Sequence, residues 1–136
     1  MKVLIVGGGQ VGGRVACLLW AKGFLVTVVD PREAVLARVQ QDLAGASILA
    51  GNGADPAVLE AAGATTADVV CAVTGADETN LAIATLAKFE FGVSRVLARV
   101  NNPRNQWLFE SDLGVDVAVN QAGVMAELVV KGIELD

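Results

Sequence analysis

Apolar residues along this chain gather in six short runs, and longer segments with a helical pattern separate them. The runs are rich in Val, Ile and Leu without polar alternation, which is typical of strands covered on both faces. This pattern predicts strands over Lys2–Val6, Leu25–Val29, Ser47–Ala50, Val69–Val73, Arg95–Arg99 and Asp116–Val119. It predicts helices over about Gln10–Lys22, Pro31–Asp42, Pro56–Ala62, Asp77–Phe91, Pro103–Ser111 and Ala122–Lys131.

The alternation of strands and helices predicts an α/β fold with a parallel sheet and right-handed crossovers. Six strands fit a doubly wound, Rossmann-like sheet with helices on both faces and strand order 3-2-1-4-5-6. We expect residues 1–120 to form this domain and residues 121–136 to form a separate C-terminal helix. That helix is apolar, so it must pack on its own sheet or on a partner. We expect it to cross to a second copy or to act as a linker.

A glycine-rich turn follows the first predicted strand directly. Gly7 permits a tight turn, Gly9 lets the backbone approach a pyrophosphate, and Gly12 allows close packing of helix on strand. The helix that begins near Gln10 offers free N–H groups and the positive end of its dipole to phosphates. A plain glycine turn would contain the same residues, but the order of strand, turn, helix and strand favours dinucleotide binding.

Asp30 follows the second predicted strand, about 20 residues beyond the glycine turn. A carboxylate there can accept hydrogen bonds from both adenosine ribose hydroxyls and repels a 2′-phosphate, which favours NAD(H) or an adenine nucleotide over NADP. The same acid is placed to cap a helix that begins at Pro31, and the two roles are compatible. Arg32 either stacks on adenine or is solvated, and the sequence favours neither.

The loop after the third predicted strand is expected at the adenine end of the site. Asn52 can both donate to and accept from the edge of an adenine base, although a simple turn residue would look the same. Asp55 precedes Pro56, and this pair predicts the cap and first residue of a helix. Asn102 and Pro103 predict another helix start in the same way.

Two more loops end at the same edge of the predicted sheet. Thr74 and Gly75 should face the glycine turn across the crevice, because strands one and four are neighbours at the switch point. We expect Asp77 and Glu78 to cap the helix that follows, with Thr74 in a capping box. Arg99 closes the fifth strand and can reach a phosphate as a planar donor; a surface salt bridge is the alternative.

Composition argues against several classes of protein. The net charge of the 136 residues is −5 and the Lys and Arg residues are scattered, so the sequence predicts no nucleic-acid partner. No apolar run reaches the roughly 18 residues that a spanning helix needs, so we expect a cytoplasmic protein without direct membrane insertion. Cys17 and Cys71 lie in apolar surroundings and are interpreted as core thiols. The chain lacks His and Tyr, two common proton carriers, which argues against an enzyme.

The second half of the chain carries the more specific motifs. These are Thr74-Gly75-Ala76-Asp77-Glu78-Thr79-Asn80, Ala98-Arg99-Val100-Asn101-Asn102-Pro103, Leu108-Phe109-Glu110 and Leu113-Gly114-Val115-Asp116. With these motifs, essentially the whole chain resembles the N-terminal, NAD-binding domain of the RCK family, also called KTN or TrkA-N domains. That family regulates potassium channels and Trk/Ktr-type potassium uptake systems.

The resemblance implies a cytosolic regulatory subunit that binds NAD(H), or ATP or ADP at the same site, and gates a membrane potassium transporter or channel. It implies a protein peripheral to the inner face of the cell membrane that pairs with itself, as a homodimer or a larger ring. Asn120-Gln121 stands where some members carry an acid that helps to place a cation, so no metal is predicted. The candidate cofactor site comprises Gly7, Gly8, Gly9, Gln10, Val11, Gly12, Asp30, Pro31, Arg32, Gly51, Asn52, Gly53, Thr74, Gly75, Ala76 and Arg99.

Two alternatives share the same Rossmann half. An NAD-dependent oxidoreductase would need a substrate domain and usually a proton carrier in addition. An NAD-binding domain that is part of a larger enzyme would be recognised from the neighbouring sequence.

Overall fold

A computed structural model describes residues 1–135 and contains one six-stranded parallel sheet. Its order is β3-β2-β1-β4-β5-β6, which confirms the predicted Rossmann-like topology. The strand bounds agree with the predicted ones to within one residue. The strands are β1 (Lys2–Val6), β2 (Leu25–Asp30), β3 (Ser47–Ala50), β4 (Val69–Ala72), β5 (Arg95–Val100) and β6 (Val117–Asn120).

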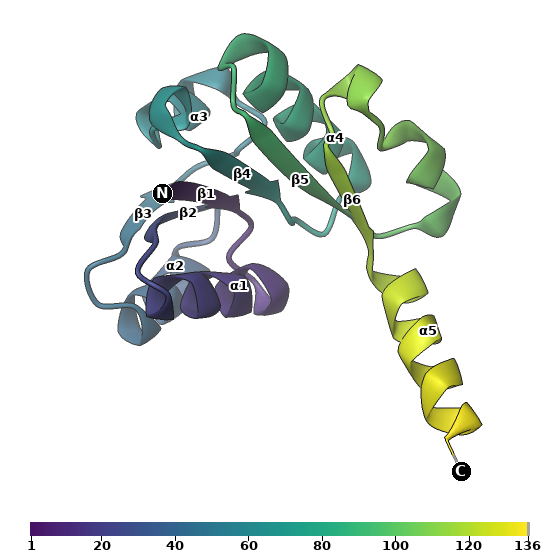
Figure 1. Ribbon diagram of the computed structural model, residues 1–136. Coiled ribbons are helices and arrows are strands. Elements are labelled where there is room, and N and C mark those ends of the chain that lie inside the picture. The colour runs from purple at the N-terminus through teal and green to yellow at the C-terminus, as the bar shows by residue number, and fades with distance from the viewer. Residues whose placement is uncertain (136) are drawn as a thin grey trace.

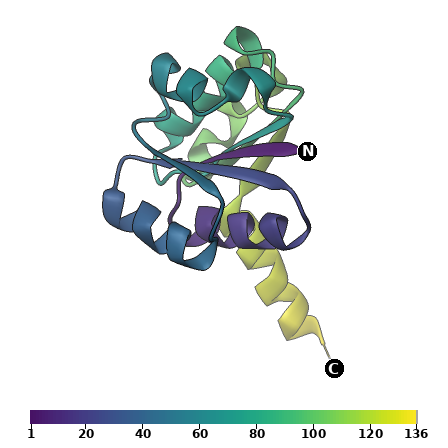
Figure 2. The same cartoon turned by 90° about the vertical axis from the view of Figure 1, so that its left-hand side faces the viewer.

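Helices cover both faces of the sheet (Figures 1 and 2). On one face lie α1 (Gln10–Ala21) and α2 (Glu33–Asp42). On the other lie α3 (Pro56–Ala61) and α4 (Asp77–Thr85), and α4 continues into a π-helical segment, η2 (Leu86–Glu90). The remaining elements are the 3₁₀ segments η1 (Ala64–Thr66), η3 (Pro103–Leu108) and η4 (Ser111–Leu113), and the C-terminal helix α5 (Gln121–Glu134).

The alternation of side chains along β1 builds two separate apolar cores. Val3 and Ile5 pack with residues of α1 and α2, while Leu4 and Val6 pack with residues of α3 and α4. Side chains point to opposite faces at successive strand positions, so a central strand must be apolar at both. The Val, Ile and Leu runs of the sequence are the consequence of this double burial.

The helix predicted over Asp77–Phe91 is α-helical only as far as Thr85 and then π-helical, and two other predicted helices differ more from the observed structure. The second was expected to begin at Pro31, but α2 begins at Glu33 because Arg32 remains extended, with its backbone N–H donating to the Asp30 carboxylate. The expected helix over Pro103–Ser111 is two 3₁₀ segments instead. The chain leaves helical geometry at Phe109 (φ −88°, ψ 69°), whose side chain is buried in the core.

Helix α5 projects away from the domain (Figure 1). It begins at the expected place, where the Asn120 side chain accepts a hydrogen bond from the N–H of Gly123 at 3.0 Å. No residue of α5 is buried, so within residues 1–135 the helix does not pack on its own sheet. Its exposed apolar residues are Val124, Met125, Leu128, Val129, Val130 and Ile133.

Candidate functional site

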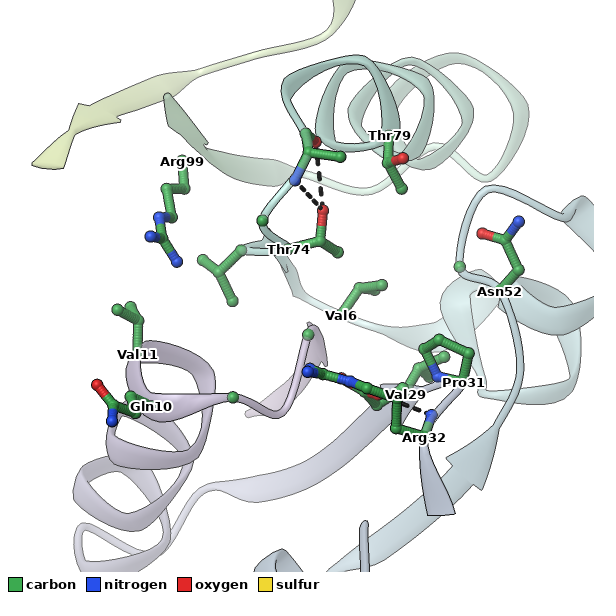
Figure 3. A pocket seen from close by; sticks show the side chains of 17 residues that line it. Val6, Gln10, Val11, Val29, Pro31, Arg32, Asn52, Thr74, Thr79 and Arg99 are labelled. Atoms are coloured by element: carbon green, nitrogen blue, oxygen red, sulfur yellow. Dashed lines mark hydrogen bonds and ion pairs between the residues drawn. The ribbon is translucent and has the colours of Figure 1, made fainter. Parts of the chain in front are cut away.

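A cavity of about 610 Å³ lies at the carboxyl ends of the central strands (Figure 3). Its floor is the turn between β1 and α1, and its walls are the loops after β2, β3 and β4 together with Arg99 near the end of β5. In an open α/β sheet this is the expected place for a ligand, where the strand order reverses. The lining residues are Val6, Gly7, Gly9, Gln10, Val11, Val29, Asp30, Pro31, Arg32, Asn52, Gly53, Val73, Thr74, Gly75, Ala76, Thr79 and Arg99.

The glycines of the first turn have different structural roles. Gly7 has φ +111°, and a Cβ there would lie 2.8 Å from the carbonyl oxygen of Val73. A Cβ on Gly12 would collide with the carbonyl oxygen of Gly7, because α1 crosses closely over the end of β1. Gly9 precedes the first residue of α1. Among the described residues other than its chain neighbours, the Arg32 guanidinium alone comes within 4 Å of where a Cβ would be. Gly7 and Gly12 are therefore required by packing, whereas Gly9 leaves backbone open to the cavity.

Asp30 is the last residue of β2 and is only 2% exposed, yet it is charged. Its Oδ2 accepts from the N–H of Gly8 at 3.0 Å, and its Oδ1 accepts from the N–H of Arg32 at 2.8 Å. Burial alone raises the pKa of this carboxyl, but the hydrogen bonds from Arg32 and Gly8 outweigh burial and hold the pKa below its usual value. Asp30 is not the N-cap of α2, which is Arg32.

The guanidinium of Arg32 pairs with the same carboxylate. Its Nε donates to Oδ1 of Asp30 and its Nη2 to Oδ2, both at 3.0 Å, which is a bidentate pair. The Arg32 side chain is 63% exposed, so solvent screens this pair and its contribution to stability is small. The sequence left stacking on adenine and solvation open, and the observed pairing with Asp30 was not among those alternatives.

The loop after β4 is held by Asn80, a fully buried residue of α4. Its Oδ1 accepts from the backbone N–H and the hydroxyl of Thr74, at 2.9 and 2.7 Å. Its Nδ2 donates to the carbonyl oxygens of Thr74 and Arg99, at 3.1 and 3.0 Å. One amide therefore fixes the ends of β4 and β5 to each other at the wall of the cavity.

Asp77 does not cap α4, contrary to expectation. The N-cap residue is Ala76, without a side-chain hydrogen bond to the helix, and the Thr74 hydroxyl accepts instead from the N–H of Ala76 at 3.3 Å. The buried Asp77 carboxylate reaches the loop after β5, where it accepts from the N–H groups of Asn101 and Asn102, at 2.6 and 2.9 Å. Glu78, expected as a second cap, is exposed.

The side-chain amides of the same loop complete the coordination of Asp77. Asn101 Nδ2 donates to Oδ1 at 3.1 Å and Asn105 Nδ2 donates to Oδ2 at 2.8 Å. Burial alone raises the pKa of Asp77, but the hydrogen bonds from Asn101, Asn105 and Asn102 outweigh burial and hold it below its usual value. Asp77 thus anchors the loop that follows Arg99, and neither Asp77 nor this loop lines the cavity.

The adenine end of the cavity was predicted at Asn52. Its side chain lines the cavity, as Figure 3 shows, and its Oδ1 accepts from the N–H of Ala54 at 3.0 Å. It is therefore a turn residue that also faces the cavity. Asp55 caps α3 as expected, accepting from the N–H of Ala57 at 3.0 Å, and Asn102 caps η3 by accepting from the N–H of Arg104.

Arg99 projects into the cavity from the end of β5 (Figure 3). Within residues 1–135 it forms no salt bridge, so the surface ion pair named as the alternative is not observed. Its Nε is buried and has no hydrogen-bond partner among those residues. An unsatisfied buried donor is uncommon in folded proteins, and this Nε can donate to an acceptor that enters the cavity.

A second, apolar cavity of about 290 Å³ adjoins the first. It lies between α1, the sheet and the start of α5, and Val11, Val73 and Arg99 line both cavities. Leu97, Val119, Val124, Met125 and Leu128 contribute most of its other apolar surface.

Most of the predicted site residues come together in the structure. Three of them do not line the cavity, namely Gly8, Gly12 and Gly51. Gly8 faces side chains of β2 and α2, and Gly51 faces Val58 of α3. Sequence reasoning missed Thr79, which is two residues into α4 after Asp77, and the apolar strand ends Val6, Val29 and Val73. These residues could have been found from their positions. Val6, Val29 and Val73 lie at strand ends that meet the crevice, and Thr79 lies in the first turn of the helix after β4.

The sheet order and the glycine turn place this chain among Rossmann-like α/β domains. A family model described as the TrkA-N domain matches residues 3–121. The chain belongs to the TrkA-N family, the N-terminal domain of RCK proteins. Among residues 1–135, no helix has the length and apolarity needed to cross a membrane.

Named relatives agree with this assignment. The chain is 37% identical over 137 residues to the Trk system potassium uptake protein TrkA of Mycobacterium tuberculosis (strain ATCC 25618 / H37Rv). The match includes 99% of this chain and 60% of that protein, so the chain spans about three fifths of its relative's length.

Solved structures share the fold. The Shewanella denitrificans Kef CTD in AMP-bound form has a TM-score of 0.81 and 25% identity, over 98% of this chain and 80% of that one. The GsuK channel bound to NAD has a TM-score of 0.73 and 19% identity, over 87% of this chain and 21% of that one.

Proposed function

We propose that this domain is a regulatory sensor that binds an adenosine nucleotide, NAD(H) or ATP/ADP, and thereby controls a potassium uptake transporter or channel. One observation carries the proposal. The cavity combines an open glycine at a helix N-terminus, a buried ionised acid at the end of β2 and the polar Asn52 loop after the neighbouring strand β3. These are the groups needed for phosphates, a ribose diol and a base, in that spatial order.

The residues of the cavity fit such a ligand. Gly9, Gln10 and Val11 at the start of α1 would hold the phosphates, since the free N–H groups of a helix N-terminus favour anions. Asp30 would accept the ribose hydroxyls, and Asn52 with Gly53 would meet the adenine. The Arg99 guanidinium, whose Nε has no hydrogen-bond partner among the described residues, would donate to a phosphate oxygen. A volume of about 610 Å³ lies in the range typical of small-molecule sites.

The lining groups favour sensing over catalysis. The chain contains neither His nor Tyr, and its buried acids are already engaged: Asp30 by Arg32 and Gly8, and Asp77 by three asparagines. A group with a depressed pKa that accepts several hydrogen bonds is a poor proton carrier at neutral pH. We therefore propose no enzymatic activity for this domain.

The proposed partners are a second copy of the chain and a membrane potassium transporter or channel subunit. Helix α5 carries exposed apolar residues away from the domain, and the apolar cavity at its base is lined by the same helix. Because both the helix and the cavity occur on every copy, two copies can exchange helices in a self-complementary way. The protein would then act at the inner face of the membrane through its transporter partner.

Isothermal titration calorimetry with NADH, NAD, ATP and ADP tests the nucleotide part of the proposal. We expect saturable binding of at least one of these ligands, and at least a tenfold loss of affinity in Asp30→Ala, because hydrogen bonds to a charged group contribute about 1.5–3 kcal/mol. Asp42→Ala, an exposed acid outside the cavity, is the matched control. Binding of none of the four ligands would refute the proposal.

A further inference from the structure

The carboxylate that would read the ribose has no free acceptor position in this structure. An ionised carboxylate offers about four lone-pair positions. Asp30 uses one on each oxygen for a backbone N–H, Arg32 on Oδ1 and Gly8 on Oδ2. The other position on each oxygen is taken by the Arg32 guanidinium, through Nε and Nη2. A ribose cannot be recognised by Asp30 while this pair is intact.

The two kinds of donor differ in how easily they leave. The backbone donors are fixed, because Gly8 lies in the turn after β1 and Arg32 lies in the loop between β2 and α2. Asp30 itself is only 2% exposed. The guanidinium sits on a side chain that is 63% exposed. Departure of the guanidinium would free one position on Oδ1 and one on Oδ2. The two hydroxyl groups of a cis-diol would donate to these same two positions. The Arg32 guanidinium and a ribose diol therefore compete for the Asp30 carboxylate.

The same guanidinium also reaches the phosphate end of the cavity. Its Nη2 lies 3.7 Å from the position that a Cβ on Gly9 would occupy, next to the N-terminus of α1. Figure 3 shows the Arg32 side chain at the base of the cavity, which Gln10 and Val11 also line. A guanidinium released from Asp30 therefore remains within reach of an anion bound at the helix N-terminus, where a bidentate phosphate contact replaces the lost carboxylate.

We propose that Arg32 is an exchange latch that makes the site selective for ligands with both a phosphate and a free cis-diol. In the free protein the guanidinium holds Asp30. A nucleotide offers the phosphate to Arg32 and the diol to Asp30, so both charged groups stay paired. A nucleoside offers only the diol and leaves the cation without a partner, whereas a 2′-deoxynucleotide leaves Asp30 half-paired. The inference rests on the proposed nucleotide function and names the residue that sets its ligand class.

The latch predicts that the phosphate and the diol are read cooperatively. Calorimetry would compare adenosine, 2′-deoxyadenosine, ADP and 2′-deoxy-ADP, with the wild-type chain and with Arg32→Ala. In the wild type we expect loss of the 2′-hydroxyl to weaken ADP binding about tenfold or more, the usual effect of a hydrogen bond to a charged group, and adenosine binding less than about twofold. In Arg32→Ala the two losses become equal, and adenosine binds several-fold more tightly than to the wild type.

Two further variants sharpen the result. Arg32→Lys keeps the charge but has no planar fork, so it should retain only part of the cooperativity. Arg104→Ala removes an exposed arginine outside the cavity and should behave as the wild type. If Arg32 instead stacks on adenine, Arg32→Ala weakens all four ligands by a similar factor, which overturns the latch and leaves the proposed function intact. If no ligand binds to any of the proteins, the proposed function fails as well.

Discussion

Replacing Asp77 tests how the loop that follows Arg99, next to the cavity, is held in place. In Asp77→Ala, the backbone N–H groups of Asn101 and Asn102 and the side-chain amide of Asn105 lose their acceptor. Hydrogen bonds to a charged group contribute about 1.5–3 kcal/mol each, but these share one carboxylate and the loop can relax toward water. We therefore expect the free energy of unfolding at pH 7 to fall by about 2–4 kcal/mol.

The asparagine variant separates charge from shape. Each oxygen of Asp77 accepts two hydrogen bonds, so in Asp77→Asn the new NH₂ group must face two donors whichever way the amide is turned. We expect Asp77→Asn to lose nearly as much stability as Asp77→Ala. Glu78→Ala is the matched control, because Glu78 lies in the same first turn of α4 and is exposed.

The assay is urea unfolding followed by far-ultraviolet circular dichroism, with the midpoint and slope fitted at several pH values. The folded-state pKa of Asp77 lies below its unfolded value, so its contribution is present above the unfolded pKa of 3.8 and is lost as the pH falls through the folded pKa. The difference between wild type and Asp77→Ala should therefore shrink below about pH 4. A loss below about 0.5 kcal/mol at pH 7, or a difference that does not depend on pH, would refute this account.

Three further predictions follow from the site and its surroundings. Gly9→Ala should cost less than about 1 kcal/mol of stability, since φ is −69° and space is free, but should weaken every phosphate-bearing ligand because it blocks backbone approach; unchanged affinity in calorimetry would contradict this. Leu128→Asp should shift sedimentation toward the monomer at micromolar concentration, whereas an unchanged profile would remove α5 from the proposed interface. Burial raises the pKa of Cys71 to about 11, so iodoacetamide at pH 8 should leave it unmodified in the folded chain while modifying it in urea; equal rates in the two conditions would contradict that burial.

The sheet was predictable because its rules are local. A strand buried on both faces, such as β1, must be apolar at nearly every position. The outer strands β3 and β6 have no buried residue, but each is still a short, mostly apolar run that can be recognised without knowledge of the others. The prediction of a helix from Pro103 to Ser111 was wrong. The chain leaves helical geometry at Phe109, whose side chain is buried in the core, and this burial is a tertiary effect. The start of α2 was also displaced, since the Asp30 carboxylate holds Arg32 in an extended conformation.

The candidate site was predictable as far as strand ends define it. Asp30 and Arg99 lie at strand ends, Asn52 and Thr74 lie just beyond strand ends, and parallel strands bring their carboxyl ends to one edge. The contacts among these groups were not predictable. Whether Arg32 turns toward Asp30 or away from it depends on the conformation of one exposed side chain, which spacing in the sequence does not encode.

The two constrained glycines of the first turn carry a consequence for comparing relatives. Gly7 is fixed by its positive φ and by the Val73 carbonyl, and Gly12 by the Gly7 carbonyl, so both are demanded by the backbone with no ligand present. A relative that had lost nucleotide binding would be under the same pressure to keep them. The informative position is Gly9, where packing does not restrict the residue type. A side chain at this position in an otherwise intact motif would identify a domain that no longer binds the nucleotide but keeps its fold.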